Sequence, residues 1–360
     1  MRNQNQDHDD ELTRTTRQAE SARRLLELRR LSRNLITDQE RYSQLELNPD
    51  YPTKDGLRVE TLEHSLLRWI NLKRPGNAEI TWLNQQFEIN PLHLDDIASR
   101  LQRPKIDDYE AYLFIVLHFP IHNKAERVIT STELDIFLGP NDIVTVHDDN
   151  LSLLNRLFEQ CKNVPGTCDV VLGDTASFAL YQIIDVMVDN CFPILYRIAA
   201  KLEELDEEIF KSLSSGTVHE ISMVRRDIIA FRRIIKPQIT VIANLERHNR
   251  IASNEHMGSY YSDIKDHITK IWDTLEEYKD IIEGLSATYD SLSSHRLNQV
   301  IKALTLISVM LLPLTLITGL YGMNVPLPFS EEPSAFTIIM LSLVGTADIM
   351  VLIFRLRKWF

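Results

Sequence analysis

The sequence predicts an α/β domain, then a series of long helices, then two helices that cross a membrane. Strand-like apolar runs between residues 111 and 147 indicate the α/β domain. Helical periodicity dominates from about residue 173, with few breaks. After residue 302, Asp and Glu nearly vanish and two apolar runs of 18 and 19 residues appear, which predicts the membrane-spanning pair.

The predicted segments follow these changes in composition. They are a polar, helix-prone extension at 1–50, the α/β domain at 51–172, long helices at 173–302, a first transmembrane helix at 303–322, an external loop at 323–335, a second transmembrane helix at 336–354 and a basic tail at 355–360. The first residues contain no apolar core, so we expect no signal peptide.

Residues 111–120 and 132–147 carry the strand signals of the α/β domain. The second run is divided by Gly-Pro-Asn-Asp at 139–142, which predicts two strands joined by a tight turn. Residues 93–102 have the pattern of a helix. Strand and helix signals within one segment predict that the segment folds as a mixed α/β domain.

Three long helical stretches follow this domain. The first spans 177–210, Gly216 predicts a break, and the second spans about 218–247. The third begins near Tyr260 and has no proline before Pro313, so we predict an unbroken helix of more than sixty residues, about 90 Å long. That length suits a stalk that leads from a soluble domain into a membrane.

The two apolar runs, 303–320 and 336–354, are each long enough to cross a hydrocarbon core of about 30 Å. Lys and Arg are retained on the cytoplasmic side of a membrane, so their positions predict the orientation. The connecting loop has neither, whereas basic residues flank the pair on its other side: Arg296, Lys302, Arg355, Arg357 and Lys358. We therefore expect a multi-pass protein of an inner or plasma membrane, with both ends in the cytoplasm.

The composition excludes several classes of function. A net charge of −12 argues against nucleic-acid binding, which needs a basic face, and is compatible with cation binding or with an ordinary acidic surface. The three cysteines form no CxxC pair, so we expect reduced thiols at Cys161, Cys168 and Cys191. No HExxH or GxSxG motif is present, so we expect no enzyme and only structural roles for His118, His122, His147 and His267.

One face of the first span gathers most of its polar and small residues. Positions alternately three and four apart form this seam: Asn298, Ile301, Thr305, Ser308, Leu312, Thr315, Gly319 and Gly322. Such a seam serves close helix packing in membranes, or it lines a water-filled pore. Periodicity alone leaves both interpretations open. A pore would require several copies of the chain, because two spans cannot enclose one.

Tyr321-Gly322-Met323-Asn324 follows the first span directly. With this motif the sequence resembles the CorA family of magnesium channels, whose signature is Gly-Met-Asn at the outer end of the first of two C-terminal spans. The resemblance extends to the Pro-Leu-Thr inside the span, to the basic tail, and to the stretches 69–70, 91–117, 183–190 and 263–267. It covers about residues 55 to 360 and leaves the N-terminal extension outside.

The resemblance implies a homopentamer in a lipid membrane, with the first span lining a pore for Mg²⁺ and Co²⁺. Gly322, Met323 and Asn324 would form the selectivity filter, where amide oxygens recognise the hydrated ion without stripping its waters. Asn298 would form a polar ring at the cytoplasmic end. Leu304 and Leu312 match family positions of a hydrophobic constriction that gates by dewetting.

The resemblance also implies regulation by cytoplasmic Mg²⁺. Asp96 and Asp263 match a pair of carboxylates that binds Mg²⁺ between neighbouring subunits, and Asp95 and Asp185 match an accessory site. Bound Mg²⁺ would hold the pore shut and its loss would release the subunits. Entry would be passive, because an inside-negative potential of about 100 mV supplies roughly 4.6 kcal/mol per divalent ion. No nucleotide-binding Gly-rich loop and no organic cofactor are expected.

Two departures from the family pattern leave alternatives open. The external loop reads VPLPFSEEPS, in which Glu331 and Glu332 can still concentrate cations. Asp348 lies inside the second span, where a charge is costly, and we expect it to be protonated, hydrogen-bonded to Thr346 or Ser308, or involved in proton coupling. The alternatives to a Mg²⁺ channel are a Zn²⁺ or Ni²⁺ transporter of the ZntB-like branch and a membrane receptor or scaffold without transport.

Overall fold

The computed structural model describes residues 57–100, 102–123, 128–164, 166–173, 175–211, 214–248, 257–323 and 334–357. The predicted extension at 1–50, Asn324, Glu331, Glu332 and the last three residues of the tail lie outside the described residues. The chain divides into two compact units, Met1–Leu285 and Ser286–Phe360, which are described in turn.

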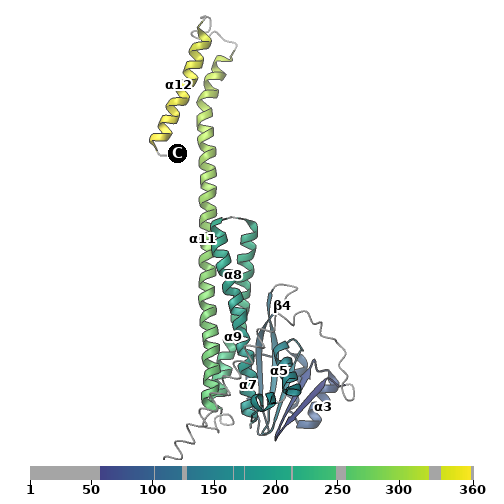
Figure 1. Ribbon diagram of the computed structural model, residues 1–360. Helices are drawn as coiled ribbons and strands as arrows, with labels where there is room; N and C mark the ends of the chain where they lie inside the picture. Colours follow the sequence, from purple (N-terminus) through teal and green to yellow (C-terminus); the bar gives the residue numbers. More distant parts are fainter. Residues whose placement is uncertain are drawn as a thin grey trace, which may run out of the picture. The chain divides into compact units, whose positions relative to one another are not determined.

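The first unit is built on a mixed six-stranded sheet (Figure 1). Its strands are β1 (Val59–His64), β2 (Leu67–Lys73), β3 (Lys105–Asp108), β4 (Leu113–Asn123), β5 (Val128–Leu138) and β6 (Asp142–His147), in the order β1-β2-β6-β5-β4-β3. Neighbouring strands are antiparallel except β2 and β6, which are parallel. The predicted strands and the turn at 139–142 are confirmed, since the Gly139 amide donates to the Asp142 carbonyl at 2.8 Å.

Helices α3 (Asn77–Phe87) and α4 (Pro91–Ser99) pack on one face of the sheet. Their shared core includes Leu83, Ile97, Phe114 and Phe137. The Asn90 side chain caps α4 by accepting from the Leu92 amide. The predicted helix at 93–102 ends earlier, at Ser99, because Arg100 adopts a left-handed conformation with φ of 48° and closes the last turn.

Helices α5 (Ser152–Asn163), α6 (Thr167–Val171) and α7 (Ala176–Asp189) lie on the other face, and α9 (Ser215–Arg247) also packs against β3, β4 and β5. Trp69 is fully buried there, with its indole N–H donating to the Thr145 hydroxyl at 3.0 Å and its ring edge-on to Phe158 of α5. Cover on both faces explains why the central strands read as nearly continuous apolar runs.

The long helices differ from the prediction in two details. The stretch 177–210 is divided at Asn190 into α7 and α8 (Cys191–Lys211), because Pro193 has no amide hydrogen to bond the Asp189 carbonyl. Helix α9 (Ser215–Arg247) begins before Gly216, capped by the Ser214 hydroxyl, which accepts from the Thr217 amide. The predicted break between the two helices exists but lies before Ser215, so its placement at Gly216 is wrong.

Helix α11 (Met257–Tyr321) is a single helix of 65 residues, and the predicted unbroken helix is confirmed. Within the first unit its buried side chains recur at intervals of three, four or seven positions: Tyr261, Ile264, Ile268, Ile271, Leu275 and Ile282. This stripe packs beside α7, α8 and α9 (Figure 1). The Tyr261 hydroxyl donates to the Ser177 carbonyl of α7 at 3.0 Å, and Lys265 pairs with Glu246 of α9 at 2.9 Å.

The second unit consists of the C-terminal part of α11 and of α12 (Ala335–Leu356). Among the described residues, three helical segments are long and apolar enough to cross a membrane: Ala176–Lys211, Met257–Tyr321 and Phe336–Leu356. The apolar window of the first is 67% buried, so it forms part of the core of the first unit. The windows of the other two are 0% buried, and these two helices contain the predicted apolar runs 303–320 and 336–354.

Candidate functional site

The seam on α11 is exposed along its described length. Ile301 is 51% and Leu312 is 68% exposed, and the polar seam residues between them are exposed too. The Thr305 hydroxyl donates to the Ile301 carbonyl at 2.8 Å, and the Thr315 hydroxyl donates to the Leu311 carbonyl at 3.0 Å. These bonds use each hydroxyl proton, so the remaining lone pairs of both oxygens can accept hydrogen bonds from water.

A different face of α11 is covered within the second unit. Its half-buried residues are Leu306, Met310, Pro313, Leu314 and Ile317. At about 100° per residue they lie roughly opposite the seam. Helix α12 runs alongside this part of α11, with its own half-buried residues at Ile339, Leu343, Ala347 and Met350 (Figure 1). The chain therefore covers one apolar face of α11 and leaves the polar seam uncovered, together with apolar residues on other faces such as Ile307 and Leu316.

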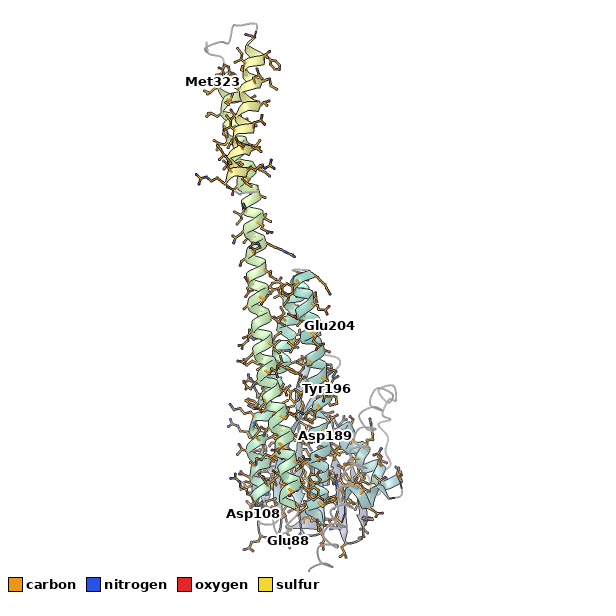
Figure 2. All side chains as sticks on the ribbon, turned by 60° about the vertical axis from the view of Figure 1, so that its left-hand side comes forward. Glu88, Asp108, Asp189, Tyr196, Glu204 and Met323 are labelled. Carbon is orange, nitrogen blue, oxygen red and sulfur yellow. The ribbon has the colours of Figure 1, made fainter. Side chains whose placement is uncertain are left out.

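The predicted filter begins where α11 ends. Tyr321 is the last helical residue, and the Gly322 amide donates to the Thr318 carbonyl at 3.0 Å. A Cβ atom at Gly322 would lie 3.1 Å from the Thr318 carbonyl oxygen, so the close approach of backbone favours glycine. Met323 is 53% exposed and is labelled in Figure 2. Asn324, the third residue of the motif, lies outside the described residues.

A cluster of titratable side chains lies between α7 and α11, and we call it the α7–α11 cluster. It consists of Asp185 and Asp189 from α7 and Asp263 and His267 from α11. Ligand atoms of Asp185, Asp263 and His267 all lie within 4.8 Å of one another. The His267 Nδ1 atom is 3.4 Å from Asp189 Oδ1, and Nε2 is 3.9 Å from Asp263 Oδ1. Figure 2 labels Asp189.

Local helix geometry explains this arrangement. Asp185 and Asp189 are four residues apart on α7, and Asp263 and His267 are four residues apart on α11. Residues with this spacing share one face of a helix, so two facing helices bring all four together. The family resemblance indicated Asp185 and Asp263 as metal ligands but did not indicate Asp189, and we expected only a structural role for His267. The repeated four-residue spacing was the signal that could have found them.

The acidic residues shift the pKa values of their neighbours. The hydrogen bond to Asp189 raises the pKa of His267 above its ordinary value, against the opposing effect of burial, and the Asp263 and Asp185 carboxylates add to this rise. Burial and then the carboxylates of Asp185 and Asp263 raise the pKa of Tyr181. The cluster thus has a strongly negative field that favours any cation. Its oxygen ligands suit Mg²⁺, and its imidazole also suits Co²⁺.

Asp95 and Asp96 do not join the α7–α11 cluster within one chain. Both lie on α4, where Asp95 is exposed. The Asp96 Oδ2 atom is 2.8 Å from the Lys105 Nζ atom at the start of β3. A site that combines Asp96 with Asp263, as the family resemblance implies, would have to form between two chains.

Asp348 is exposed on α12 and lies roughly opposite the half-buried face of that helix. The Thr346 hydroxyl donates to the Ser342 carbonyl at 2.7 Å, one turn earlier. Among the described residues no hydrogen bond joins Asp348 to Thr346 or Ser308, so the expected bond is not formed within the chain. Ser308 is on the seam, which faces away from α12.

Comparison with known proteins places these features in a family. A family model described as CorA-like Mg²⁺ transporter protein matches residues 65–358. The chain is 29% identical to the cobalt/magnesium transport protein CorA of Thermotoga maritima over 293 residues, which covers 81% of this chain and 83% of that protein.

Solved structures share the fold. The CorA magnesium transporter from Methanocaldococcus jannaschii superposes with a TM-score of 0.74 at 23% identity, covering 83% of this chain and 93% of that one. The ZntB cytoplasmic domain from Vibrio parahaemolyticus superposes with a TM-score of 0.52 at 15% identity, covering 64% of this chain and 88% of that one. At these identities both likenesses concern the fold alone.

Proposed function

The chain belongs to the family of CorA-like Mg²⁺ transporters, and on this basis we propose that it is a passive channel through which divalent cations enter the cell. It is therefore a membrane transporter of divalent cations and not an enzyme. We propose Mg²⁺ as the main substrate and Co²⁺ as a second one. The working form is a homopentamer in a lipid membrane, with both ends of each chain in the cytoplasm.

The exposure of the seam is the observation that supports this function best. Within one chain, α12 covers the opposite face of α11 and leaves Asn298, Thr305, Ser308 and Thr315 exposed. Uncovered polar groups are costly against lipid but favourable against water. Five copies of α11 that turn their seams inward would enclose a water-filled pathway. Leu304 and Leu312 would narrow this pathway and allow it to close by dewetting.

Gly322, Met323 and Asn324 form the proposed filter at the outer mouth. Mg²⁺ gives up its waters reluctantly, so a ring of neutral amides that bonds those waters can select the hydrated ion and still release it. Glu331 and Glu332 in the connecting loop would raise the local concentration of cations. The inside-negative membrane potential drives entry, since roughly 4.6 kcal/mol is released per divalent ion at about 100 mV.

Regulation is assigned to carboxylates of the cytoplasmic unit. Asp95 and Asp96 of one subunit would face Asp185 and Asp263 of the next, and these oxygen ligands suit a hard cation such as Mg²⁺. Asp189 adds a third carboxylate and His267 adds an imidazole to this side of the site. Without a cation the facing acids repel one another, so the closed arrangement would form only when cytoplasmic Mg²⁺ is abundant.

Neither alternative has comparable support. The relative from Thermotoga maritima is named for cobalt and magnesium, whereas the likeness to ZntB concerns the fold alone. A receptor or scaffold without transport does not agree with membership of a transporter family. A proton-coupled mechanism would give Asp348 a role, but the seam and the filter motif do not require one.

The test is Mg²⁺ flux into proteoliposomes that contain a Mg²⁺-sensitive dye and hold an inside-negative potential. We expect influx with the wild-type protein and at least tenfold less with Asn324→Ala. Thr318→Val is the matched control, because Thr318 lies on α11 but off the seam. Zn²⁺ flux without Mg²⁺ flux would favour the ZntB-like alternative, and equal flux through Asn324→Ala would refute the proposed filter.

A further inference from the structure

Lys105 is held between two carboxylates, one of which is a proposed ligand of the regulatory cation. Its Nζ atom lies 2.8 Å from Asp96 Oδ2 and 2.7 Å from Asp107 Oδ2. The side chain of Asp96 is 18% exposed and that of Lys105 is 32% exposed. The ammonium also lies 5.3 Å from the centroid of the Phe114 ring, a favourable cation–π distance. Lys105 is thus fixed on three sides.

The second carboxylate is itself held in place. Asp107 Oδ2 lies 3.4 Å from Nε2 of His93, whose side chain is 3% exposed. The other ring nitrogen of His93 is 2.9 Å from the Tyr112 hydroxyl. A lysine ammonium keeps its charge at neutral pH, and two carboxylates within 2.8 Å of the Lys105 Nζ atom favour that charged form.

A divalent cation that binds Asp96 must therefore compete with the Lys105 ammonium, which already pairs with this carboxylate. We infer that Lys105 is the chain's own competitor for the regulatory cation at Asp96 and sets the Mg²⁺ concentration at which the site fills. This inference rests on the proposed function, in which Asp96 binds cytoplasmic Mg²⁺. It adds a residue that bears on the affinity of the site without being a ligand.

The geometry makes this competition reversible. Because Lys105 is bonded to two carboxylates, it can release Asp96 to an incoming cation and keep its ion pair with Asp107. If Asp96 were the only partner of Lys105, release of Asp96 would leave the partly buried ammonium unpaired, at a much larger cost in free energy. Two substitutions should consequently act in opposite directions. Removing the Lys105 ammonium leaves Asp96 available to a cation. Removing the charge of Asp107 leaves Asp96 as the one charged carboxylate that Lys105 contacts, so the pair with Asp96 becomes stronger.

The experiment measures thermal unfolding of the purified full-length protein in detergent as MgCl₂ is increased, and reports the Mg²⁺ concentration that gives half of the total stabilisation. We expect Lys105→Met to lower this midpoint on the order of tenfold, since it removes a unit charge close to a divalent ion. Lys105→Arg, which keeps the charge, should stay within about twofold of wild type. Asp107→Asn should raise the midpoint several-fold.

The matched control is Lys201→Met, which removes an ammonium paired with Glu204 on its own helix, α8, and with Glu220 on α9. It should leave the midpoint unchanged. Asp263→Ala tests the proposed site itself and should abolish the Mg²⁺ response.

Three results would decide the matter. Opposite shifts in Lys105→Met and Asp107→Asn would support the competition. An unchanged or raised midpoint in Lys105→Met, with Asp263→Ala still abolishing the response, would overturn the competition and leave the proposed regulation standing. If the wild-type protein showed no response to Mg²⁺, the proposed regulation would fail and the inference would fall with it.

Discussion

Substitution of Asp185 by Asn tests whether Asp185 is a metal ligand or a carboxylate with only a structural role. The ligand atoms of Asp185 and Asp263 lie within 4.8 Å of each other, and both side chains are only partly buried. Two unit charges at that distance repel by about 1 to 3 kcal/mol, depending on how strongly solvent screens them. The Asn side chain has nearly the same shape, so the change removes this repulsion and leaves the packing intact. Without a divalent cation, Asp185→Asn should therefore be more stable than wild type.

With a divalent cation the order should reverse. Mg²⁺ binds carboxylates more strongly than amides, so the variant should lose much of the stabilisation that Mg²⁺ confers on the wild type. The assay is thermal unfolding of the full-length protein in EDTA and in excess MgCl₂. In EDTA we expect a rise of a few degrees, because each kcal/mol shifts the midpoint by roughly 1–2 °C in a chain of 360 residues.

Asp206→Asn is the control, because Asp206 is exposed on α8 and away from the α7–α11 cluster. It should change neither midpoint by more than about a degree. If Asp185→Asn were less stable than wild type in EDTA and gained as much from Mg²⁺, Asp185 would be a structural carboxylate and the electrostatic argument would be refuted.

Three further predictions concern the cluster and the membrane helices. The raised pKa of His267 means that its contribution in metal-free protein is complete below the ordinary pKa of 6.5 and is lost as pH rises through the folded-state value, so stability in EDTA should fall over that window. His267→Gln should remove this decline of the unfolding temperature with rising pH. If the decline persisted in the variant, groups other than His267 would be its cause. Leu312→Ala should increase Mg²⁺ leak in proteoliposomes several-fold, whereas Ile307→Ala, 58% exposed on another face of α11, should not; equal leak would argue against a constriction on the seam. Asp348→Asn should leave flux and its pH dependence unchanged, and a lost pH dependence would instead establish proton coupling.

Features with a local cause could be predicted from the sequence. The span lengths, the unbroken α11 and the turn between β5 and β6 each follow from residues close together in the chain, since hydrophobic period, proline and turn chemistry act over a few positions. The errors were local too. The left-handed Arg100 shortened α4, and Pro193 divided the stretch 177–210, because one residue can outweigh a periodic pattern.

Less of the candidate site than of the fold could be predicted from the sequence. Its motif, Gly322-Met323, and its seam could be read along one helix, but the partners of the acidic residues could not. Asp96 pairs with Lys105 across α4 and β3, and Asp263 meets Asp185 across α11 and α7. The resemblance to a family indicated which acids to consider, yet it did not indicate Lys105 or Asp189.

The sequence by itself determined the two apolar spans, the long α11, the polar seam and the Gly322-Met323-Asn324 motif. Only the tertiary structure decided that β2 pairs in parallel with β6, that α12 leaves the seam uncovered, and that His267 joins three carboxylates. The physical reason is that such contacts join segments distant in the chain. They form when complementary apolar faces are buried together, and a local pattern specifies each face but not its partner.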